Sequence, residues 1–498
     1  MNSSQPCRVV VVGAGISGLT TAYRLRKLLG PAAEIVLVEG SRRLGGALRT
    51  VELAGVALDV GAEAFLVRRP EAVALVQELG LSGQLVHPTP VAPSVRGAGR
   101  TRPLPTRTIM GLPGAAADVA DLLSPQGLAR VAAEPTVPLR WEPGRDAAVG
   151  TLLRERVGDE LVDRLVDPLL GGVYAGRADA LGLRATLPTV AAALDRGAGS
   201  LLAAAGAVLA AGSAPGRPVF ATLRGGLSGL VDALVSAAAV RPLLATPVCG
   251  LARTVAGWRL ELGSRLLGAG GLDHLDADAV VLAIPAPALW RLLADPLPAA
   301  SAAAGRVEVA SCAVVGLALP RDAAQALPEA SGVLVAATES QEKSLSVKAF
   351  TFSGRKWAHA SSREVVLVRA SLGRHGEARV LQRDDAALVD AVRADLAALT
   401  GIIAKPVATV VARWGGGLPQ YAPGHGEVVA ALERAIAGWG GLAVAGATLH
   451  GVGLPACIAT ADAAARRIAG YLSSVTSAPR GGTMPRGGTM PRGGTVGS

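Results

Sequence analysis

Aromatic residues are scarce in this chain, at 3% of 498 residues. Proteins that bind nucleic acid stack bases on aromatic rings and carry clustered basic side chains. The net charge is +10, but the sequence has no basic block and no helix-turn-helix pattern. We therefore expect no nucleic-acid partner. The positive field would favour a small anionic substrate, with a merely solvated arginine surface as the alternative.

Cysteine is also rare and shows no pairing pattern. The four cysteines are far apart and form no CxxC motif, which predicts neither a metal site nor a disulfide framework. The leading residues, MNSSQPC, are too short and too polar for a signal peptide. We therefore expect a cytoplasmic protein.

Long apolar runs are missing as well. The nearest candidate, Gly197 to Gly216, is uncharged over about 20 residues, which is the length that a membrane span needs. Alanine and glycine dominate it, so a buried or surface-lying helix is expected and no transmembrane span. A peripheral membrane contact in this region stays an open alternative.

Near the N-terminus, valine and glycine form an ordered pattern. Val9–Val12 predicts a buried parallel strand, and GAGISG at 13–18 fits G-x-G-x-x-G at the start of a helix that runs to Leu29. A second strand, Ile35–Val38, ends at Glu39, whose carboxylate can bind ribose hydroxyls. This order predicts a dinucleotide site. A glycine-rich turn in an ordinary α/β protein is the alternative.

A related pattern lies near the C-terminus. An apolar strand, Leu442–Ala447, precedes a small-residue turn and a helix from Ala456 to about Tyr471. A helix N-terminus after such a turn suits an anionic or electron-rich group. Residues 115–215 show helical periodicity, which predicts a helical insertion. The PRGGTM repeats after Ser477 have almost no apolar content and predict a disordered tail.

Residues 96–114 are rich in Arg, Gly and Pro and predict a hairpin with a loop. Arg100, Arg102 and Arg107 are candidate partners for substrate carboxylates, although lone arginines in a loop are more often only solvated.

Longer motifs carry a family resemblance. RLGG begins at Arg43, DVGAEAF at Asp59, DPLLGGVYAG at Asp167, VVLAIPA at Val280 and WGGGLPQYAPGH at Trp414. Over about residues 8–472, in this order, the chain resembles the bacterial oxygen-dependent porphyrinogen oxidases of the flavin amine oxidase superfamily.

The resemblance implies an α/β fold. Its parts would be a Rossmann-like FAD-binding domain of the GR2 flavoprotein oxidase type, a mixed-sheet substrate domain and a helical insertion. The implied division is 1–95, 216–300 and 413–474 for the FAD-binding domain, 96–215 for the helical insertion, 301–412 for the substrate-domain sheet and 475–498 for the tail.

The implied cofactor is FAD. It would be non-covalent, because the pattern around Cys457 resembles that of the porphyrinogen oxidases. Glu63 could instead cap a helix starting near Pro70, Trp414 could be a core residue, and Gly171-Gly172 could be a simple turn. The flavin-contacting positions implied are Gly13, Ala14, Gly15, Ile16, Ser17, Gly18, Glu39, Gly40, Arg43, Gly46, Ala47, Gly61, Ala62, Glu63, Ala64, Val248, Trp414, Ala447, Val452, Gly453 and Leu454. The substrate-binding positions implied are Gly171, Gly172 and Arg100.

The implied reaction is oxidation of coproporphyrinogen III to coproporphyrin III, with molecular oxygen as acceptor and hydrogen peroxide as product. The product could pass to a ferrochelatase. No catalytic residue is assigned, because no histidine or carboxylate stands out as an indispensable base. The alternatives are a protoporphyrinogen IX oxidase, a flavin amine oxidase, and a regulator or porphyrin carrier that is not an enzyme. An amine oxidase usually has an aromatic cage, for which this chain has little material.

Overall fold

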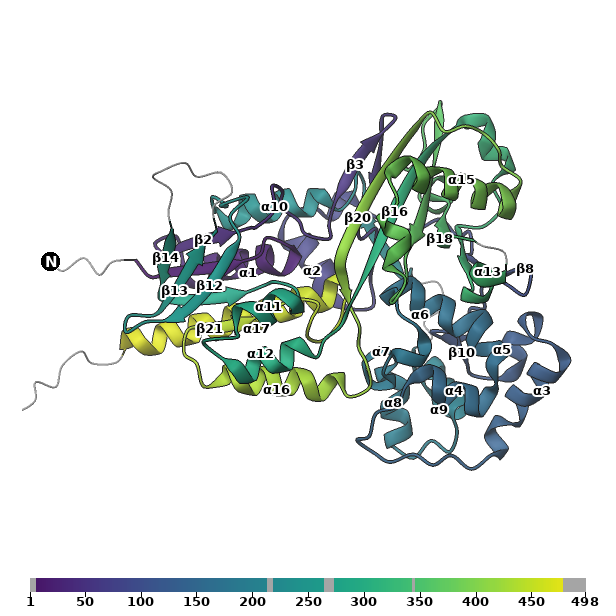
Figure 1. Cartoon of the computed structure of the whole chain (residues 1–498), viewed down its shortest axis with the longest axis horizontal. Helices are drawn as coiled ribbons and strands as arrows, with labels where there is room; N and C mark the ends of the chain where they lie inside the picture. The colour runs from purple at the N-terminus through teal and green to yellow at the C-terminus, as the bar shows by residue number, and fades with distance from the viewer. Residues whose placement is uncertain (1–5, 213–217, 264–272, 343–344, 478–498) are drawn as a thin grey trace, which may run out of the picture.

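The computed structural model of the protein describes residues 6–212, 218–263, 273–342 and 345–477. Three parts are visible in Figure 1: a parallel-sheet part that contains both ends of the described chain, a seven-stranded sheet, and a helical part.

The parallel-sheet part is built from three distant segments. Its strand order is β2-β1-β15-β21, and every neighbouring pair is parallel. The strands are rich in valine and leucine and are nearly fully buried, as expected for a parallel sheet covered on both faces. Their bounds are β1 Arg8–Val12, β2 Glu34–Val38, β15 Ala279–Leu282 and β21 Leu442–Val444.

Helices cover both faces of this sheet. Two of them, α1 and α17, lie side by side in Figure 1 and pack with α2 and α10 around one apolar core. The other face is covered by α11, α12 and α16 and by an antiparallel three-stranded sheet, β12-β13-β14. The bounds are α1 Ile16–Leu29, α2 Pro70–Glu78, α10 Ser228–Ala238, β12 Val248–Arg253, β13 Trp258–Leu262, β14 His274–Ala277, α11 Ala286–Leu292, α12 Pro298–Gly305, α16 His425–Ala437 and α17 Leu454–Ser477.

The seven-stranded sheet has the order β20-β16-β19-β18-β17-β7-β8. It is mixed, because β17 and β7 are parallel while the other pairs are antiparallel. One face packs on α15 and the other on the hairpin β3–β4. The bounds are β3 Thr50–Leu53, β4 Val56–Asp59, β7 Ser94–Gly97, β8 Arg100–Pro103, β16 Val309–Pro320, β17 Gly332–Val335, β18 Val347–Thr351, β19 Val365–Leu372, α15 Asp385–Thr400 and β20 Ala408–Pro419.

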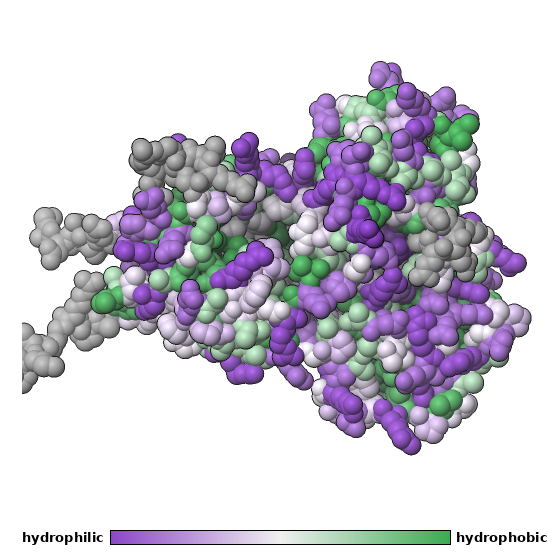
Figure 2. Space-filling view, viewed as in Figure 1, coloured by the Kyte–Doolittle hydropathy of each residue, from purple (hydrophilic) through white to green (hydrophobic). Residues whose placement is uncertain are grey.

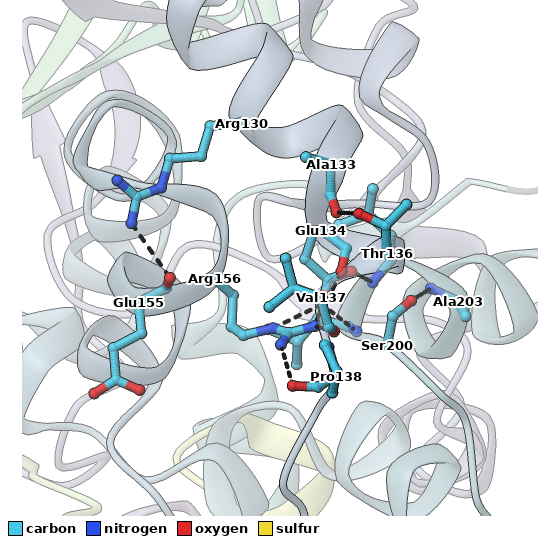
Figure 3. A network of polar contacts seen from close by, with 12 residues as sticks. Arg130, Ala133, Glu134, Thr136, Val137, Pro138, Glu155, Arg156, Ser200 and Ala203 are labelled. Atoms are coloured by element: carbon cyan, nitrogen blue, oxygen red, sulfur yellow. Dashed lines mark hydrogen bonds and ion pairs between the residues drawn. The ribbon is translucent and has the colours of Figure 1, made fainter.

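The helical part carries its own core. A buried polar network, shown in Figure 3, links the helices of this part. In it, Arg156 donates two hydrogen bonds to Glu134 Oε1, at 2.8 and 3.1 Å. Glu134 in turn accepts from the backbone N–H groups of Leu201 and Leu202, at the first turn of α9. The bounds are η2 Ala116–Leu122, α3 Pro125–Ala133, η3 Glu134–Thr136, α4 Val149–Val157, α5 Asp159–Leu161, η4 Val162–Val166, α6 Asp167–Tyr174, η5 Ala178–Ala180, α7 Leu183–Thr186, α8 Pro188–Asp195 and α9 Leu201–Gly212.

The surface over the helical part is mostly hydrophilic on the face drawn in Figure 2. No helix among the described segments is both long and apolar enough to span a membrane. The uncharged run from Gly197 forms α9 as far as Gly212, and its last residues lie outside the described part of the chain.

The mixed α/β class, the helical insertion and the hairpin at residues 96–114 are confirmed. The expected division into domains stays a prediction. In the structure, β20 runs across residue 412, and Trp414 continues the strand ladder opposite Cys312. The PRGGTM repeats lie outside the described residues.

Candidate functional site

Two helices begin next to each other at the carboxyl end of the parallel sheet. The Ser17 hydroxyl donates to the Cys457 carbonyl at 3.3 Å, so the first turns of α1 and α17 are adjacent. A helix N-terminus offers backbone N–H groups without intrahelical partners and a partial positive charge. Together the two N-termini form an electropositive corner, which we call the glycine-lined corner after the residues around it.

Glycine is required in this corner by sterics. A Cβ on Gly13 (φ +96°) would lie 2.4 Å from the Ala283 carbonyl oxygen, and a Cβ on Gly18 would lie 1.7 Å from the Gly13 oxygen. Gly46 (φ +56°) approaches Gly15 so closely that a Cβ on Gly46 would be 2.9 Å from the Gly15 Cα. The backbone is thus brought together without side chains in between, which leaves its N–H groups accessible to a diphosphate.

Glu39 is held at the end of β2 by backbone donors. Its two carboxylate oxygens accept from the Ala14 and Ser41 N–H groups, both at 2.8 Å. A carboxylate has about four acceptor positions, so it retains capacity for ribose hydroxyls. The Thr246 N–H donates to the Glu39 carbonyl at 2.9 Å, which places Val248, the first residue of β12, near the same strand end.

Trp414 lies beside the glycine-lined corner, is half-buried and packs against the core cluster under the seven-stranded sheet, so a role as a core tryptophan stays an alternative. Its indole N–H donates to the Val60 carbonyl at 2.8 Å. The Arg43 guanidinium lies over its ring, 5.2 Å from the centroid, and donates to the Gly46 carbonyl at 2.6 Å. A Cβ on Gly61 would lie 3.1 Å from the ring. Three implied flavin positions, Arg43, Gly46 and Gly61, therefore surround this indole.

Glu63 forms a cluster of polar contacts near this corner. Its carboxylate accepts from Lys356 Nζ at 2.8 Å and from the Trp357 indole at 2.9 Å, and Arg369 Nη1 lies 3.5 Å away. Burial alone would raise the pKa of Glu63, but the charges of Lys356 and Arg369 outweigh it and lower the pKa to about 2. Arg369 also donates to the Gly61 carbonyl at 2.5 Å, which ties this ion pair to the segment DVGAEAF, whose residues are among the implied flavin-contacting positions.

The alternative role for Glu63, a helix cap, is wrong. Helix α2 begins at Pro70 with Arg69 as the N-cap residue and no side-chain capping bond. The carboxylate of Glu63 instead pairs with Lys356, which follows β18, and with Arg369, which lies on β19.

Gly171 and Gly172 lie inside helix α6, so the expectation of a simple turn is also wrong. A π-helical segment, η4, directly precedes α6, a feature frequent at functional sites. Gly172 is exposed, and a Cβ there would lie 3.4 Å from Leu334 on β17. Helix α6 therefore presents bare backbone across from the seven-stranded sheet.

The segment after Trp414 connects α6 with the start of α17. The Tyr421 hydroxyl donates to the Ala447 carbonyl, and its ring lies 5.6 Å from that of Tyr174 at the end of α6. His425 stacks on Tyr421 at 4.0 Å and contacts the Leu449 carbonyl through Nε2 at 2.9 Å. These contacts bring the implied positions near Ala447 and Val452 toward Gly171 and Gly172.

Arg100 is placed differently. It is exposed on β8, at the outer edge of the seven-stranded sheet. It lines a cavity of about 400 Å³ together with Arg102 and Arg164, and neither Gly171 nor Gly172 lines that cavity. The structure thus does not bring Arg100 to the other implied substrate positions.

One cation near the site, Arg369 on β19, was not singled out from the sequence. Lys348 on β18 opens the segment KAFTFSGRKWAH, which resembles a K-x-x-T-x-x-S-x-K-W motif of the porphyrinogen oxidases. Among the described residues, no group of His, Cys, Asp and Glu side chains is arranged to hold a metal ion.

Comparison with known proteins assigns this architecture to a family. The family model described as flavin containing amine oxidoreductase matches residues 16–469. Coproporphyrinogen III oxidase of Mycobacterium tuberculosis is 44% identical over 461 residues, 92% of this chain and 96% of that protein. The enzyme of the same name from Bacillus subtilis is 31% identical over 478 residues, 94% and 98% of the two chains.

Solved structures agree with this assignment. A crystal structure named for a protoporphyrinogen oxidase from Exiguobacterium sp. has a TM-score of 0.80 at 29% identity, covering 94% of this chain and 99% of the other. Cyclohexylamine oxidase from Brevibacterium oxydans, at 16% identity and a TM-score of 0.66, covers 94% and 100% and shares the fold. On these matches, the chain belongs to the flavin-containing amine oxidoreductases.

Proposed function

We propose that this protein is an FAD-dependent oxidase that converts coproporphyrinogen III to coproporphyrin III, with oxygen as acceptor and hydrogen peroxide as product. The observation that carries the proposal is its 44% identity, over nearly the whole chain, to coproporphyrinogen III oxidase of Mycobacterium tuberculosis. The proposal includes a cytoplasmic enzyme whose product passes to a ferrochelatase.

The glycine-lined corner fits FAD. Its two helix N-termini suit the diphosphate and the negative charge of a reduced flavin, and Glu39 suits the adenosine ribose. Arg43, Gly46, Gly61 and Trp414 would hold the isoalloxazine side. Such a group would accept a hydride from the substrate in each of three two-electron oxidations.

The proposal includes non-covalent attachment. The Cys457 thiol is buried, and burial raises its pKa to about 11, so at neutral pH it is a thiol and a poor nucleophile. Acid precipitation should therefore release the flavin completely, and the intact protein mass should carry no flavin adduct.

The chain's own groups would orient the substrate and exclude water. The exposed backbone of Gly172 suits a flat macrocycle lying against α6. We assign no side chain as an indispensable base, and expect backbone carbonyls near Gly172 or solvent to take the pyrrole protons. In an alanine scan of polar residues around this space, one position that costs the roughly 100- to 10,000-fold typical of a general base would refute this assignment.

A protoporphyrinogen IX oxidase is the second candidate, favoured by the structural match to the Exiguobacterium protein. An amine oxidase is less well supported. The Tyr421 hydroxyl is committed to a backbone carbonyl and the Trp414 indole to another, and few other aromatic side chains are available for a cage.

The deciding experiment is anaerobic mixing of the purified holoprotein with each porphyrinogen, followed by aerobic turnover. We expect coproporphyrinogen III to bleach the flavin absorbance rapidly and to yield porphyrin fluorescence with three equivalents of peroxide, faster than protoporphyrinogen IX. A protein that holds flavin but is reduced by neither porphyrinogen would refute the proposal, and reduction by polyamines instead would identify an amine oxidase.

A further inference from the structure

Lys348 is a buried lysine in the seven-stranded sheet. Its exposed fraction is 4%, and no ion pair of its ammonium occurs among the described residues, although its nitrogen is not one of the fully enclosed polar atoms there that lack a partner. A buried charge is normally paired, because leaving it unpaired in a low-dielectric interior is costly. This lysine therefore calls for an explanation beyond packing.

The strand geometry directs Lys348 toward the glycine-lined corner. Val347 is opposite Leu372 and Ala349 is opposite Ser371, so Lys348 is the extra residue of a β-bulge. Val347 and Leu372 pack in the core under α15. Bulges re-aim side chains and are frequent beside active sites.

The charges around the ammonium are consistent with this face. The titratable groups that act most strongly on it are Cys312, Arg374, Arg369 and Glu377. Cys312 is opposite Trp414 in the ladder, and Arg369 donates to the Gly61 carbonyl. Both lie on the face that is turned to the segment DVGAEAF.

The same place adjoins α6. Strands β17 and β18 both contact this helix. Leu334, which pairs with Ala349 beside the bulge, is the residue that a Cβ on Gly172 would touch. Lys348 thus lies on a strand that contacts α6, on the side of the sheet where the proposed function puts the substrate.

Positive charge dominates around Lys348. Arg374 is 5% exposed and pairs with Glu377 at 4.0 Å, and Arg369 is half-buried and lies 3.5 Å from Glu63. The carboxylate that acts most strongly on the ammonium, Glu377, is thus shared with Arg374 and Arg177. Burial first, and then Arg374 and Arg369, lower the pKa of Lys348 to about 8, with Cys312 and Glu377 acting in the opposite direction. A carboxylate from a ligand would relieve this repulsion and hold the lysine protonated.

We propose that Lys348 binds a propionate carboxylate of the substrate at the sheet side of the space facing α6, and so selects a porphyrinogen with a propionate at that position over one with a vinyl group. This inference rests on the proposed function and deepens it. Coproporphyrinogen III carries propionates at two ring positions where protoporphyrinogen IX carries vinyl groups. A vinyl group there would leave the buried ammonium without a partner.

The kinetic test compares Lys348→Met, Lys348→Arg and the exposed control Lys405→Met, each as flavin-loaded full-length protein. Lys348→Met should raise the KM for coproporphyrinogen III at least ~10-fold with kcat changed less than about 3-fold, and should change the KM for protoporphyrinogen IX less than about 3-fold. Lys348→Arg should stay within about 3-fold of wild type for both substrates, because it retains the charge, and Lys405→Met should match wild type.

Two further measurements distinguish substrate binding from a structural role. Removing an unpaired buried charge should leave the Tm of Lys348→Met equal to or above that of wild type, whereas a structural lysine would lower it. Coproporphyrin III, titrated by quenching of flavin fluorescence, should bind wild type progressively more weakly as pH rises above about 8, approaching 10-fold per pH unit as the lysine loses its proton. Lys348→Arg should lose this pH dependence, Cys312→Ser should keep it, and the tetramethyl ester of coproporphyrin III should show none.

The outcomes separate the two claims. The role of Lys348 would be overturned by an equal loss of kcat/KM on both porphyrinogens, by a fall in kcat at constant KM, or by a pH dependence of binding that persists in Lys348→Arg. In each of these cases, turnover by the wild-type protein would still support the proposed function. A wild-type protein that no porphyrinogen reduces would refute the proposed function itself.

Discussion

At the scale of single residues, the charges beside the glycine-lined corner are arranged in interlocking pairs. Glu63 is shared by Lys356 and Arg369, and Arg369 also holds the Gly61 carbonyl. Because these groups are partly or fully buried, each ion pair supports the local backbone as well as the other charges. Removing one partner should leave the others buried and unpaired.

Glu63→Gln should lower the free energy of unfolding by about 3 kcal/mol near pH 7, the amount that corresponds to lowering its pKa from 4.5 to about 2. The folded-state pKa is depressed, so this stability is present above pH 4.5 and is lost as pH falls toward 2. Denaturant unfolding of wild type and Glu63→Gln should therefore converge between these values. The exposed variant Glu52→Gln should show little difference at any pH, and a gap for Glu63→Gln that stays constant on acidification would contradict the assignment.

Gly46→Ala should greatly weaken flavin binding, because the added methyl group would lie 2.9 Å from the Gly15 Cα and push two backbone segments apart. Gly55→Ala is a matched control. Gly55 also has a positive φ, +75°, but a Cβ there meets nothing within 4 Å. Flavin absorbance per protein after gel filtration should fall in Gly46→Ala alone, and equal loss in both variants would assign the effect to backbone strain.

At the scale of elements, helices α1 and α17 have adjacent first turns although they are far apart in the sequence. The helical part is stabilised separately, by the buried ion pair of Glu134 and Arg156. These two arrangements share no residue. Damage to the second should therefore leave the first intact.

Arg156→Met should destabilise the helical part by about 3–5 kcal/mol, because it leaves the buried carboxylate of Glu134 at the start of α9 without its cationic partner. Hydrogen exchange should increase in α3, α4 and α9, while peptides from α1 and α17 stay protected and flavin remains bound at low temperature. The control Arg145→Met, which breaks an exposed pair with Glu142, should have little effect. Loss of flavin in Arg156→Met at low temperature would show that the parts are coupled.

The elements were largely predictable from local pattern, and the site only in part. Valine runs and the glycine motif indicate β1 and α1 because strand and turn chemistry are local. The sequence could not show that Glu63 would pair with Lys356, since the partner is 293 residues away. Nor could it show the bulge at Lys348, because a bulge depends on the register of the neighbouring strand.

At the scale of the whole molecule, the glycine-lined corner is assembled from segments that begin near residues 8, 242, 279 and 442. Bound FAD would bridge them. It should therefore stabilise the entire parallel-sheet part and not one loop.

Adding FAD to the apoprotein at about 100 times its Kd should raise the free energy of unfolding by about 2.7 kcal/mol. Protection from hydrogen exchange should appear together in peptides covering β1, β12, β15 and β21. Gly46→Ala should show a much smaller shift in Tm at the same FAD concentration. Protection confined to the β1–α1 turn would mean that the distant segments do not contact the cofactor.

The strand order β2-β1-β15-β21 also determines when the parallel sheet can be completed during biosynthesis. At roughly 5–20 residues per second, a ribosome needs roughly 20–90 s between making the first strand of this sheet and the last. During that interval the sheet always has a free edge, on β1 until β15 is made and then on β15 until β21 is made. Chaperone protection of nascent chains, and the yield on heterologous expression, should therefore depend on the speed of translation through the intervening segments.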